Sequence, residues 1–362
     1  MTKPAKIAVL GATGSVGRAA CRELCAMGPY ELVLCSRQSA KATHAAQGLN
    51  TATEQRVVDI FTAAPSIFQD CDLVLNCAGP SWQTGWAAAN LAWNSGAHYV
   101  DVAGYSLLKQ RLSPYAGQAQ NQGRSMILTA GWIPGISEVF TRYALSTAEQ
   151  IHGPAKELTL YCGARDHWSE GSVSDMIWHL FNDEHTGFGY LHKGRWTRLP
   201  FWKGSRRVAI PSLADRVQSA LWVYSASTVP LALERPDISI RVGLILLSLR
   251  TRMTIAGIKT LLRKHRQRAQ TWLCNAIGND ARRLGVQGLL RVQVSSRSGH
   301  IRKFELSTTE NIHLTGMAGA AAAHMTLLGQ TNPGVHFLGE AVSAPDFLSL
   351  LADRGVRYGE AQ

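Results

Sequence analysis

Short apolar runs alternate with helical patterns over the first third of the chain. Residues 6–11 and 31–35 are largely apolar, which is typical of buried parallel strands. Between them, residues 15–27 place apolar side chains on one face of a helix. Further strands are expected at residues 56–60, 72–80, 98–104 and 125–131, with a helix ending near residue 95. Strands that alternate with helices predict an α/β fold with a doubly wound parallel sheet.

The pattern changes in the second half of the chain. Strand-like segments occur at residues 158–164, 220–225, 290–295 and 301–307, and residues 296–299 suit a turn between the last two. We therefore expect an α+β region with a mainly antiparallel sheet, which contains a long basic helix at about residues 244–275. Two more helices are expected, an alanine-rich one over residues 316–328 and a short one over residues 345–354.

Composition excludes several classes of protein. The chain has 362 residues, 46% hydrophobic and 17% charged, which excludes intrinsic disorder as its main description. No run approaches the roughly 18–20 consecutive apolar residues of a membrane span, and the N-terminus lacks the apolar segment of a signal peptide, so a cytoplasmic location is expected. Its seven cysteines include no Cys-x-x-Cys pair, and its twelve histidines are scattered. We therefore expect reduced thiols and no metal site.

Positive charge is concentrated in one segment. The net charge is +12, and no acid occurs between Asp237 and Asp280. Eight basic residues lie in that interval: Arg241, Arg250, Arg252, Lys259, Arg263, Lys264, Arg266 and Arg268. Such a segment is either a solvated helix face or a surface for an acidic partner.

The first strand, turn and helix carry a dinucleotide-binding pattern. Glycines at positions 11, 14 and 17 follow the strand and open the helix. Glycine there allows a tight turn, a close approach to a pyrophosphate and close packing of the helix on the sheet. The N-terminus of that helix then presents free N–H groups to phosphate. We assign the contacts of this loop with the cofactor to Gly11, Thr13, Gly14, Ser15, Val16 and Gly17.

Three more segments refine the cofactor. NAD-binding sites usually carry an acid at the end of the second strand, whereas this chain has Ser36 and Arg37, which suit a 2′-phosphate. NADP(H) is therefore the expected cofactor. Asp59, after the third strand, is expected to approach the adenine. The segment expected beside the nicotinamide is Cys77, Ala78, Gly79 and Pro80.

Several segments together resemble the saccharopine dehydrogenase/reductase-like superfamily. They are GATGSVG (11–17), CSR (35–37), NCAGP (76–80), HYVDVAGY (98–105), TAGWIPGIS (129–137) and NPGVHFLGE (332–340) with FLSLLADRGV (347–356). The resemblance implies a Rossmann NADP-binding domain over residues 1–135 and an inserted α+β substrate and dimerisation domain over residues 136–310. It also implies that the helices of residues 311–362 pack back on the Rossmann domain, and that the reaction is NADP(H)-linked at a carbon–nitrogen bond.

Within that superfamily the chain looks most like the thiazolinyl imine reductases of the enantio-pyochelin type. This resemblance implies a siderophore intermediate held by a nonribosomal peptide synthetase carrier domain. A flat aryl-thiazoline would suit walls made by Trp82, Trp132 and Trp168. The basic segment would attract an acidic carrier domain. A homodimer is expected through the sheet of the second domain, with neither nucleic acid nor membrane as a partner.

Imine reduction also needs a proton donor for the nitrogen. Tyr105 is the first candidate, with Lys109 as a helper and Asp101 as the residue that orients it. His167 is the second candidate because imidazole titrates near neutrality. Each also has an ordinary structural interpretation, Tyr105 as a packing aromatic and His167 as a surface loop residue.

Three other functions remain open. A saccharopine-like amino-acid dehydrogenase would need a carboxylate clamp, for which Arg142 or Arg165 are candidates. Tyr105 and Lys109 also match the Tyr-x-x-x-Lys pattern of short-chain carbonyl reductases. Finally, a Rossmann scaffold with a basic helix would suit a non-enzymatic regulator that binds nucleic acid.

Overall fold

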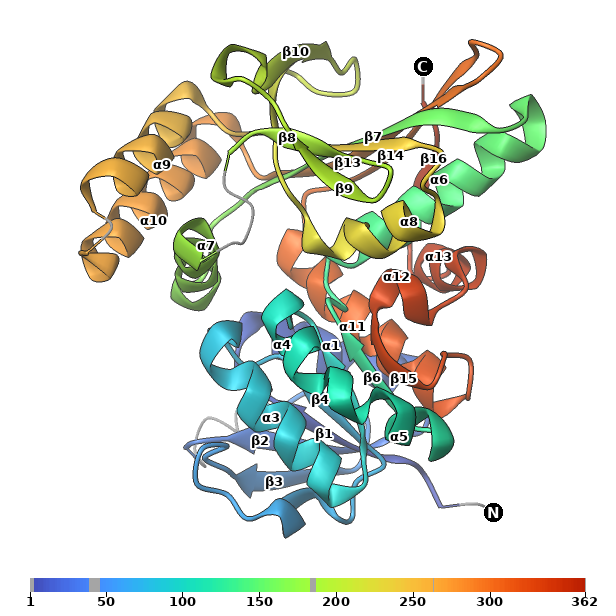
Figure 1. Ribbon diagram of the computed structural model, residues 1–362. Helices are drawn as coiled ribbons and strands as arrows, with labels where there is room; N and C mark the ends of the chain where they lie inside the picture. Colours follow the sequence, from blue (N-terminus) through green and yellow to red (C-terminus); the bar gives the residue numbers. More distant parts are fainter. Residues whose placement is uncertain (1–2, 39–45, 183–186, 263, 362) are drawn as a thin grey trace. The chain divides into compact units, whose positions relative to one another are not determined.

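The fold is described from a computed structural model, which covers residues 3–38, 46–182, 187–262 and 264–361 (Figure 1). Its internal contacts divide the chain into two compact units. Unit 1 comprises residues 1–139 and 312–354, and unit 2 comprises residues 140–311 and 355–362. The predicted α/β fold, with a parallel sheet in one part and a second sheet in the other, is confirmed.

Unit 1 contains a seven-stranded sheet in which every strand pair is parallel. Its order is β15-β6-β5-β4-β1-β2-β3. The strands are β1 (Lys6–Leu10), β2 (Glu31–Ser36), β3 (Thr53–Val57), β4 (Leu73–Asn76), β5 (His98–Asp101), β6 (Ser125–Leu128) and β15 (Gly334–Phe337). Strand order reverses direction between β1 and β4, which is where doubly wound sheets bind their ligands.

Helices cover both faces of this sheet. They are α1 (Ser15–Met27), α3 (Ser81–Ser95), α4 (Ser106–Leu112), α5 (Ala116–Asn121), α11 (Asn311–Leu327), α12 (Leu338–Ala341) and α13 (Ala344–Ala352). The apolar side chains of α3 and α4 share a core with alternate residues of the strands, including Tyr99 and Met126. On the other face α11 packs closely on α1, because a Cβ at Gly316 would lie 2.6 Å from the Val16 carbonyl oxygen. The alanine-rich sequence of α11 therefore reflects close helix packing.

Unit 2 is built around a mixed sheet in the order β10-β11-β12-β7-β13-β14-β16. Its strands are β7 (Ala155–Arg165), β8 (Gly189–His192), β9 (Arg195–Arg198), β10 (Ser205–Ala209), β11 (Val217–Trp222), β12 (Ser239–Leu244), β13 (Gln287–Ser296), β14 (Ile301–Thr308) and β16 (Tyr358–Glu360). Among the described strands of unit 2, only β12 and β7 form a parallel pair. Strands β8 and β9 form a hairpin beside β12. Its helices are α6 (Ile136–His152), which begins in unit 1, α7 (Glu170–Asn182), α8 (Val229–Glu234), α9 (Leu249–Leu261) and α10 (Arg266–Leu284).

Several elements differ from the expected ones, among them the third strand, the basic segment and the last strand. The third strand spans Thr53–Val57 rather than 56–60, because Asp59 accepts a hydrogen bond from the Phe61 N–H and starts a turn. The basic segment contains β12 and two helices instead of one, since Leu262 leaves the helical path and packs into a core shared with α7 and α10. The last strand, β16, pairs with β14 in unit 2 instead of joining unit 1. Among the described residues, no helix combines the length and hydrophobicity needed to cross a bilayer.

Candidate cofactor and catalytic site

The loop after β1 makes the turn that the glycine pattern predicts. Gly11 has a φ of +71°, which favours glycine, and its carbonyl accepts the Gly14 N–H at 2.9 Å. A Cβ at Gly11 would lie 2.9 Å from backbone atoms of Cys77 and Ala78. The loop after β1 is therefore in contact with the loop after β4, so one cofactor can reach both loops.

Gly14 and Gly17 are small for different reasons. A Cβ at Gly17 would lie 2.2 Å from the Gly11 oxygen and 2.8 Å from the Ala12 Cα, so Gly17 is required by the packing of α1 on its own loop. A Cβ at Gly14 would meet only the Gly11 oxygen, at 3.3 Å, and its φ of −76° suits any residue. A Cβ at Gly14 would therefore make one tight backbone contact, much milder than the contacts at Gly17. A small residue at Gly14 also suits the close approach of a pyrophosphate.

The N-terminus of α1 fits a phosphate group. Gly14 caps the helix and has no side chain to accept its first N–H groups, and the first turn contains no acid. Ser15 is exposed there, whereas the Thr13 carbonyl accepts Arg18 Nη1 at 2.6 Å. Uncapped N–H groups together with the helix dipole favour an anion. The predicted residues from Gly11 to Gly17 therefore form a loop that fits the phosphates of a dinucleotide.

The end of β2 presents a hydroxyl and a guanidinium group. Ser36 is half-buried and its Oγ accepts the Gln38 N–H at 3.2 Å, while Arg37 is exposed. Arg37 forms no ion pair with an acid in the described part of the chain. Its charge is therefore available for a 2′-phosphate. Asp59 is exposed two residues beyond β3, where one carboxylate oxygen is occupied by the Phe61 N–H at 3.0 Å.

A buried polar network joins the ends of β4 and β5. Asp101 is 1% exposed, and its carboxylate accepts the Tyr99 hydroxyl at 2.6 Å and the Asn76 amide at 2.9 Å through Oδ2. Its Oδ1 accepts the Ala103 N–H at 2.8 Å. Burial and the charge of Asp101 raise the pKa of Tyr99 well above its usual range, so that phenol stays neutral and donates. The Asn76 oxygen accepts the Ala78 N–H at 3.1 Å, which fixes the loop from Cys77 to Pro80.

Tyr105 follows this network as the residue that caps α4. It is half-buried, and Gly104 before it has a φ of +71° and packs on Asp101. Lys109 lies one turn further along α4, where it forms an ion pair with Glu340 and lies 4.3 Å from the centre of the Phe337 ring. Lys109 is therefore engaged by Glu340, which disfavours its role as the lysine of a Tyr-x-x-x-Lys catalytic pair.

The loop after β6 is more constrained than the sequence indicated. Thr129 has a φ of +57°, which is rare for a β-branched residue, and its N–H donates to the Ala103 carbonyl. A Cβ at Gly131 would lie 2.5 Å from the Val102 oxygen, so this loop crosses the β5 loop at backbone contact. Sequence reasoning missed Thr129, although the neighbouring glycines Gly131 and Gly135 were a signal of such a crossing.

The three predicted tryptophans have different environments. Trp82, on the first turn of α3, is 38% exposed at the carboxyl edge of the sheet of unit 1. Trp132 follows β6 and is 3% exposed, and its Nε1 has no hydrogen-bond partner among the described residues. Trp168 lies in unit 2, where it packs against the core of α7, α9 and α10. Trp82 is therefore accessible to a substrate, Trp132 is buried and Trp168 is partly buried against a core. Substrate contact by the three tryptophans stays a prediction.

His167, also in unit 2, is exposed next to a buried acid. Its N–H donates to Asp166 Oδ1 at 2.6 Å, and Asp166 Oδ2 accepts the Asn311 amide at 3.1 Å. The two arginines considered as carboxylate clamps are both engaged in unit 2. Arg142 forms a two-bond ion pair with Glu234 at 2.7 Å, and Arg165 donates to the Leu284 and Gly285 carbonyls.

Comparisons with known proteins agree with this geometry. Residues 7–127 match the family described as the saccharopine dehydrogenase NADP binding domain. The fold is similar to apo saccharopine dehydrogenase (L-Glu forming) from Saccharomyces cerevisiae, with a TM-score of 0.67, 13% identity, and coverage of 99% of this chain and 100% of that one. It is less similar to myo-inositol dehydrogenase from Lactobacillus casei, with a TM-score of 0.49, 12% identity, and coverage of 99% and 97%. No curated protein gives a sequence match.

These matches confirm the predicted nicotinamide cofactor for the first domain, because residues 7–127 match the saccharopine dehydrogenase NADP binding domain. The matched range ends with β6 and contains every predicted cofactor residue, from the Gly11 loop to Pro80. Residues 7–127 therefore form an NADP-binding domain of the saccharopine dehydrogenase type, in a chain that has the fold of such a dehydrogenase.

Proposed function

We propose that this protein is an NADPH-dependent reductase of a carbon–nitrogen double bond. The proposed substrate is a thiazolinyl imine, held by a nonribosomal peptide synthetase carrier domain during the biosynthesis of a pyochelin-like siderophore. The observation that carries the proposal is the position of Tyr105. It is a half-buried phenol at the start of α4, at the same edge of the sheet as the Gly11 loop and the loop from Cys77 to Pro80.

The reaction needs a hydride at carbon and a proton at nitrogen. When bound at the Gly11 loop, the nicotinamide cofactor would supply the hydride. The C=N π bond breaks while new C–H and N–H bonds form, and Tyr105 Oη–H is the proposed proton donor. Asp101 touches neither partner in this scheme. It holds the turn from Val102 to Gly104 that places Tyr105.

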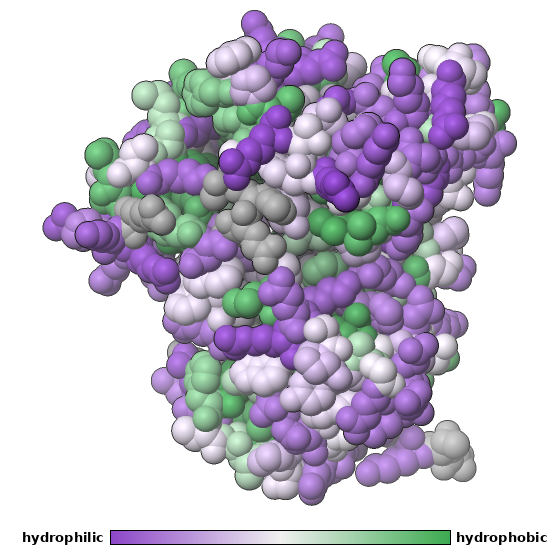
Figure 2. Space-filling model, viewed as in Figure 1, coloured by the Kyte–Doolittle hydropathy of each residue, from purple (hydrophilic) through white to green (hydrophobic). Residues whose placement is uncertain are grey.

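Two surfaces support a bulky, tethered substrate. Trp82, which is 38% exposed, offers aromatic surface at the carboxyl edge of unit 1, whereas Trp132 is buried. In unit 2 the hairpin of α9 and α10 exposes Leu249, Met253 and Trp272 among basic residues, and Figure 2 shows this mixture of apolar and hydrophilic side chains. An acidic carrier domain with an apolar contact patch would complement that surface.

A saccharopine-like amino-acid dehydrogenase is the second candidate, because the fold match to saccharopine dehydrogenase spans the whole chain. Such an enzyme needs a cation for the α-carboxylate of its substrate. Arg142 is a poor choice because Glu234 already satisfies it through two hydrogen bonds. The clamp would have to come from another residue.

The test is the oxidation of NADPH, followed by absorbance with four substrates. These are an aryl-thiazoline on its carrier domain, the free aryl-thiazoline acid, saccharopine-type imines and a simple ketone. We expect turnover of the tethered thiazoline with NADPH, much slower turnover with NADH, and no turnover of the ketone. Turnover of the saccharopine-type imines alone would refute the proposal in favour of the second candidate. Turnover of the ketone alone would restore the carbonyl reductase hypothesis.

A further inference from the structure

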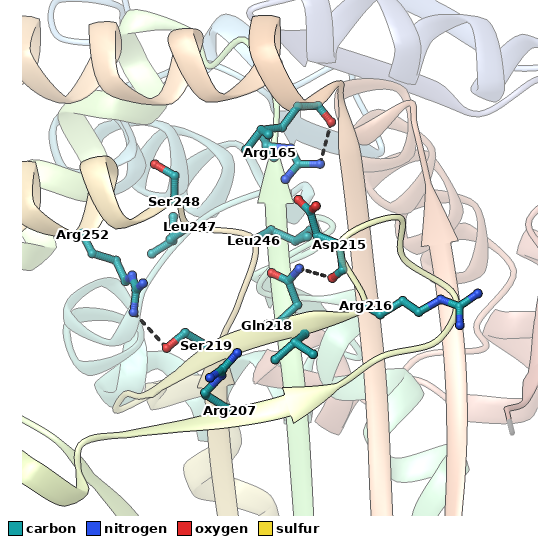
Figure 3. Close-up of a pocket in the computed structure, with 12 residues that line it drawn as sticks. Arg165, Arg207, Asp215, Arg216, Gln218, Ser219, Leu246, Leu247, Ser248 and Arg252 are labelled. Atoms are coloured by element: carbon teal, nitrogen blue, oxygen red, sulfur yellow. Dashed lines mark hydrogen bonds between the residues drawn. The ribbon is translucent and has the colours of Figure 1, made fainter.

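Unit 2 contains a cleft of about 590 Å³ whose charges the proposed reaction does not use (Figure 3). It lies between β10, β11, the loop before α9 and the end of α10. Its charged lining residues are Arg165, Arg207, Arg216, Arg252 and Asp215. Four guanidinium groups and one carboxylate leave a strong excess of positive charge in the cleft.

Three side chains converge at one corner of this cleft. Arg207 on β10 is the direct antiparallel partner of Ser219 on β11, so their side chains lie on the same face of the sheet. Arg252 reaches the same hydroxyl from α9 and donates Nη1–H to Ser219 Oγ at 2.9 Å. Figure 3 shows both guanidinium groups beside Ser219. The Nε of Arg252 is buried and has no hydrogen-bond partner among the described residues.

The charges at this corner are not compensated. Several other arginines of unit 2 have acidic partners, as Arg142 has Glu234 and Arg235 has Glu149. Within the described residues, neither Arg207 nor Arg252 forms an ion pair. Asp280, a buried acid on α10, is engaged at the start of α9, where it accepts the Ser248 N–H and the Thr251 hydroxyl.

At the opposite end of the cleft, Arg165 has other partners. Arg165 donates to the Gly285 carbonyl at 2.7 Å and to the Leu284 carbonyl at 2.8 Å. Asp215 faces Arg165 in Figure 3, and Arg216 extends away from both. The uncompensated charge is therefore confined to the corner of Arg207, Ser219 and Arg252.

We propose that this corner binds the phosphate group of a ligand. A planar carboxylate carries one negative charge and its acceptor sites lie in one plane, which matches donors from three elements less well. A tetrahedral phosphate offers three or four acceptors and the double negative charge that two arginines balance. The phosphate site itself does not rest on the proposed reduction, and only its assignment to the arm of a carrier domain does. The phosphate belongs either to a free metabolite or to the phosphopantetheine arm of a carrier domain.

Calorimetric titration of the full chain tests the inference, with saturating NADP⁺ present so that the Rossmann domain is occupied. The probes are inorganic phosphate, 4′-phosphopantetheine and pantetheine without phosphate. Arg207→Gln and Arg252→Gln are the test variants. Arg268→Gln is the matched control, because Arg268 is exposed on α10 and outside the cleft. Thermal denaturation checks that each variant is folded. Because Arg207 is exposed, its variant should fold, and it still tests the inference if the Arg252 variant unfolds.

We expect phosphate-bearing probes to bind and pantetheine not to bind. Each test variant should weaken that binding at least about tenfold, the loss of one charge-assisted contact, and the control should stay within about twofold. Tighter binding of 4′-phosphopantetheine than of inorganic phosphate would assign the site to an arm-bearing ligand. Equal affinity for the two probes would assign it to free phosphate. The inference is overturned if no phosphate probe binds, or if the three variants behave alike.

Discussion

Gly14 provides the sharpest test of the cofactor loop. Gly14→Ala adds one methyl group that would lie 3.3 Å from the Gly11 oxygen, a contact that a small shift relieves, at a φ of −76° that alanine adopts without strain. If Gly14 is small chiefly to admit the pyrophosphate, the variant should fold and lose cofactor affinity. Gly17→Ala adds the same methyl group against the backbone of Gly11 and should instead damage the fold.

The contacts of each added methyl group set the expected changes in the free energy of unfolding and in the Kd for NADPH. At Gly14, alanine is a poorer helix cap by about 0.5–1 kcal/mol, and it gains about 0.4–1 kcal/mol by restricting the unfolded chain, so the net change is close to zero. At Gly17 a contact of 2.2 Å with the Gly11 oxygen should cost about 1–3 kcal/mol of overpacking. That corresponds to roughly 2–4 °C in Tm for each kcal/mol. For NADPH, the loss of one charged hydrogen bond at Gly14 corresponds to at least about a tenfold rise in Kd.

The assay pairs thermal denaturation with fluorescence titration of NADPH. Gly117→Ala is the neutral control, because a Cβ at that exposed helical position meets nothing within 4 Å. Its Kd should equal that of the wild type. Wild-type affinity in Gly14→Ala would show that the pyrophosphate does not approach this residue, and the assignment of the loop would fail. A large fall in Tm for Gly14→Ala would show that the fold does not tolerate a methyl group beside the Gly11 oxygen.

Three further predictions concern the 2′-phosphate of the cofactor, the proton donor and the pH dependence of the free energy of unfolding. Arg37→Gln should raise the KM for NADPH about tenfold and leave that for NADH unchanged, and equal changes for both cofactors in steady-state kinetics would contradict a 2′-phosphate contact. Tyr105→Phe should lower kcat about 100-fold or more with an unchanged Kd for NADPH, and an unchanged kcat would assign the proton to another donor. Hydrogen bonds from Arg56 and Lys6 lower the pKa of Asp70, so its stabilising effect is present at neutral pH and is lost as the pH falls below about 4. Denaturant unfolding should therefore show Asp70→Asn less stable than the wild type at pH 7, with the gap closing in acid, and a gap that does not change with pH would refute the linkage.

Local patterns allowed much of unit 1 to be predicted. The first strand, turn and helix depend on neighbouring residues, and α1 begins and ends at the predicted residues 15 and 27. β15 was missed because its four residues form a strand only by pairing with β6, some 200 residues earlier. The break in the basic segment near residue 262 has no proline or glycine to signal it. It arises from the packing of Leu262 with α7 and α10.

The candidate site was predictable where residues follow strands and unpredictable where side chains pair over long distances. The sequence placed Asp101 and Tyr105 after β5, and the parallel sheet brings them to one edge. It could not show that Lys109 is held by Glu340, 231 positions away. The phosphate corner was hidden for the same reason, because Arg207, Ser219 and Arg252 come from three separate elements.

The buried network changes the interpretation of Asp101. A carboxylate that is 1% exposed and accepts three hydrogen bonds, from Tyr99, Asn76 and Ala103, has little capacity left for a substrate. Asn76 in turn holds the loop that contacts Gly11, so one acid fixes both the loop beside the cofactor phosphates and the turn that presents Tyr105. Removing its charge should therefore affect cofactor binding and proton transfer together, whereas a residue that only orients Tyr105 would affect proton transfer alone. Asp101 is thus a positioning residue that couples the two halves of the proposed site.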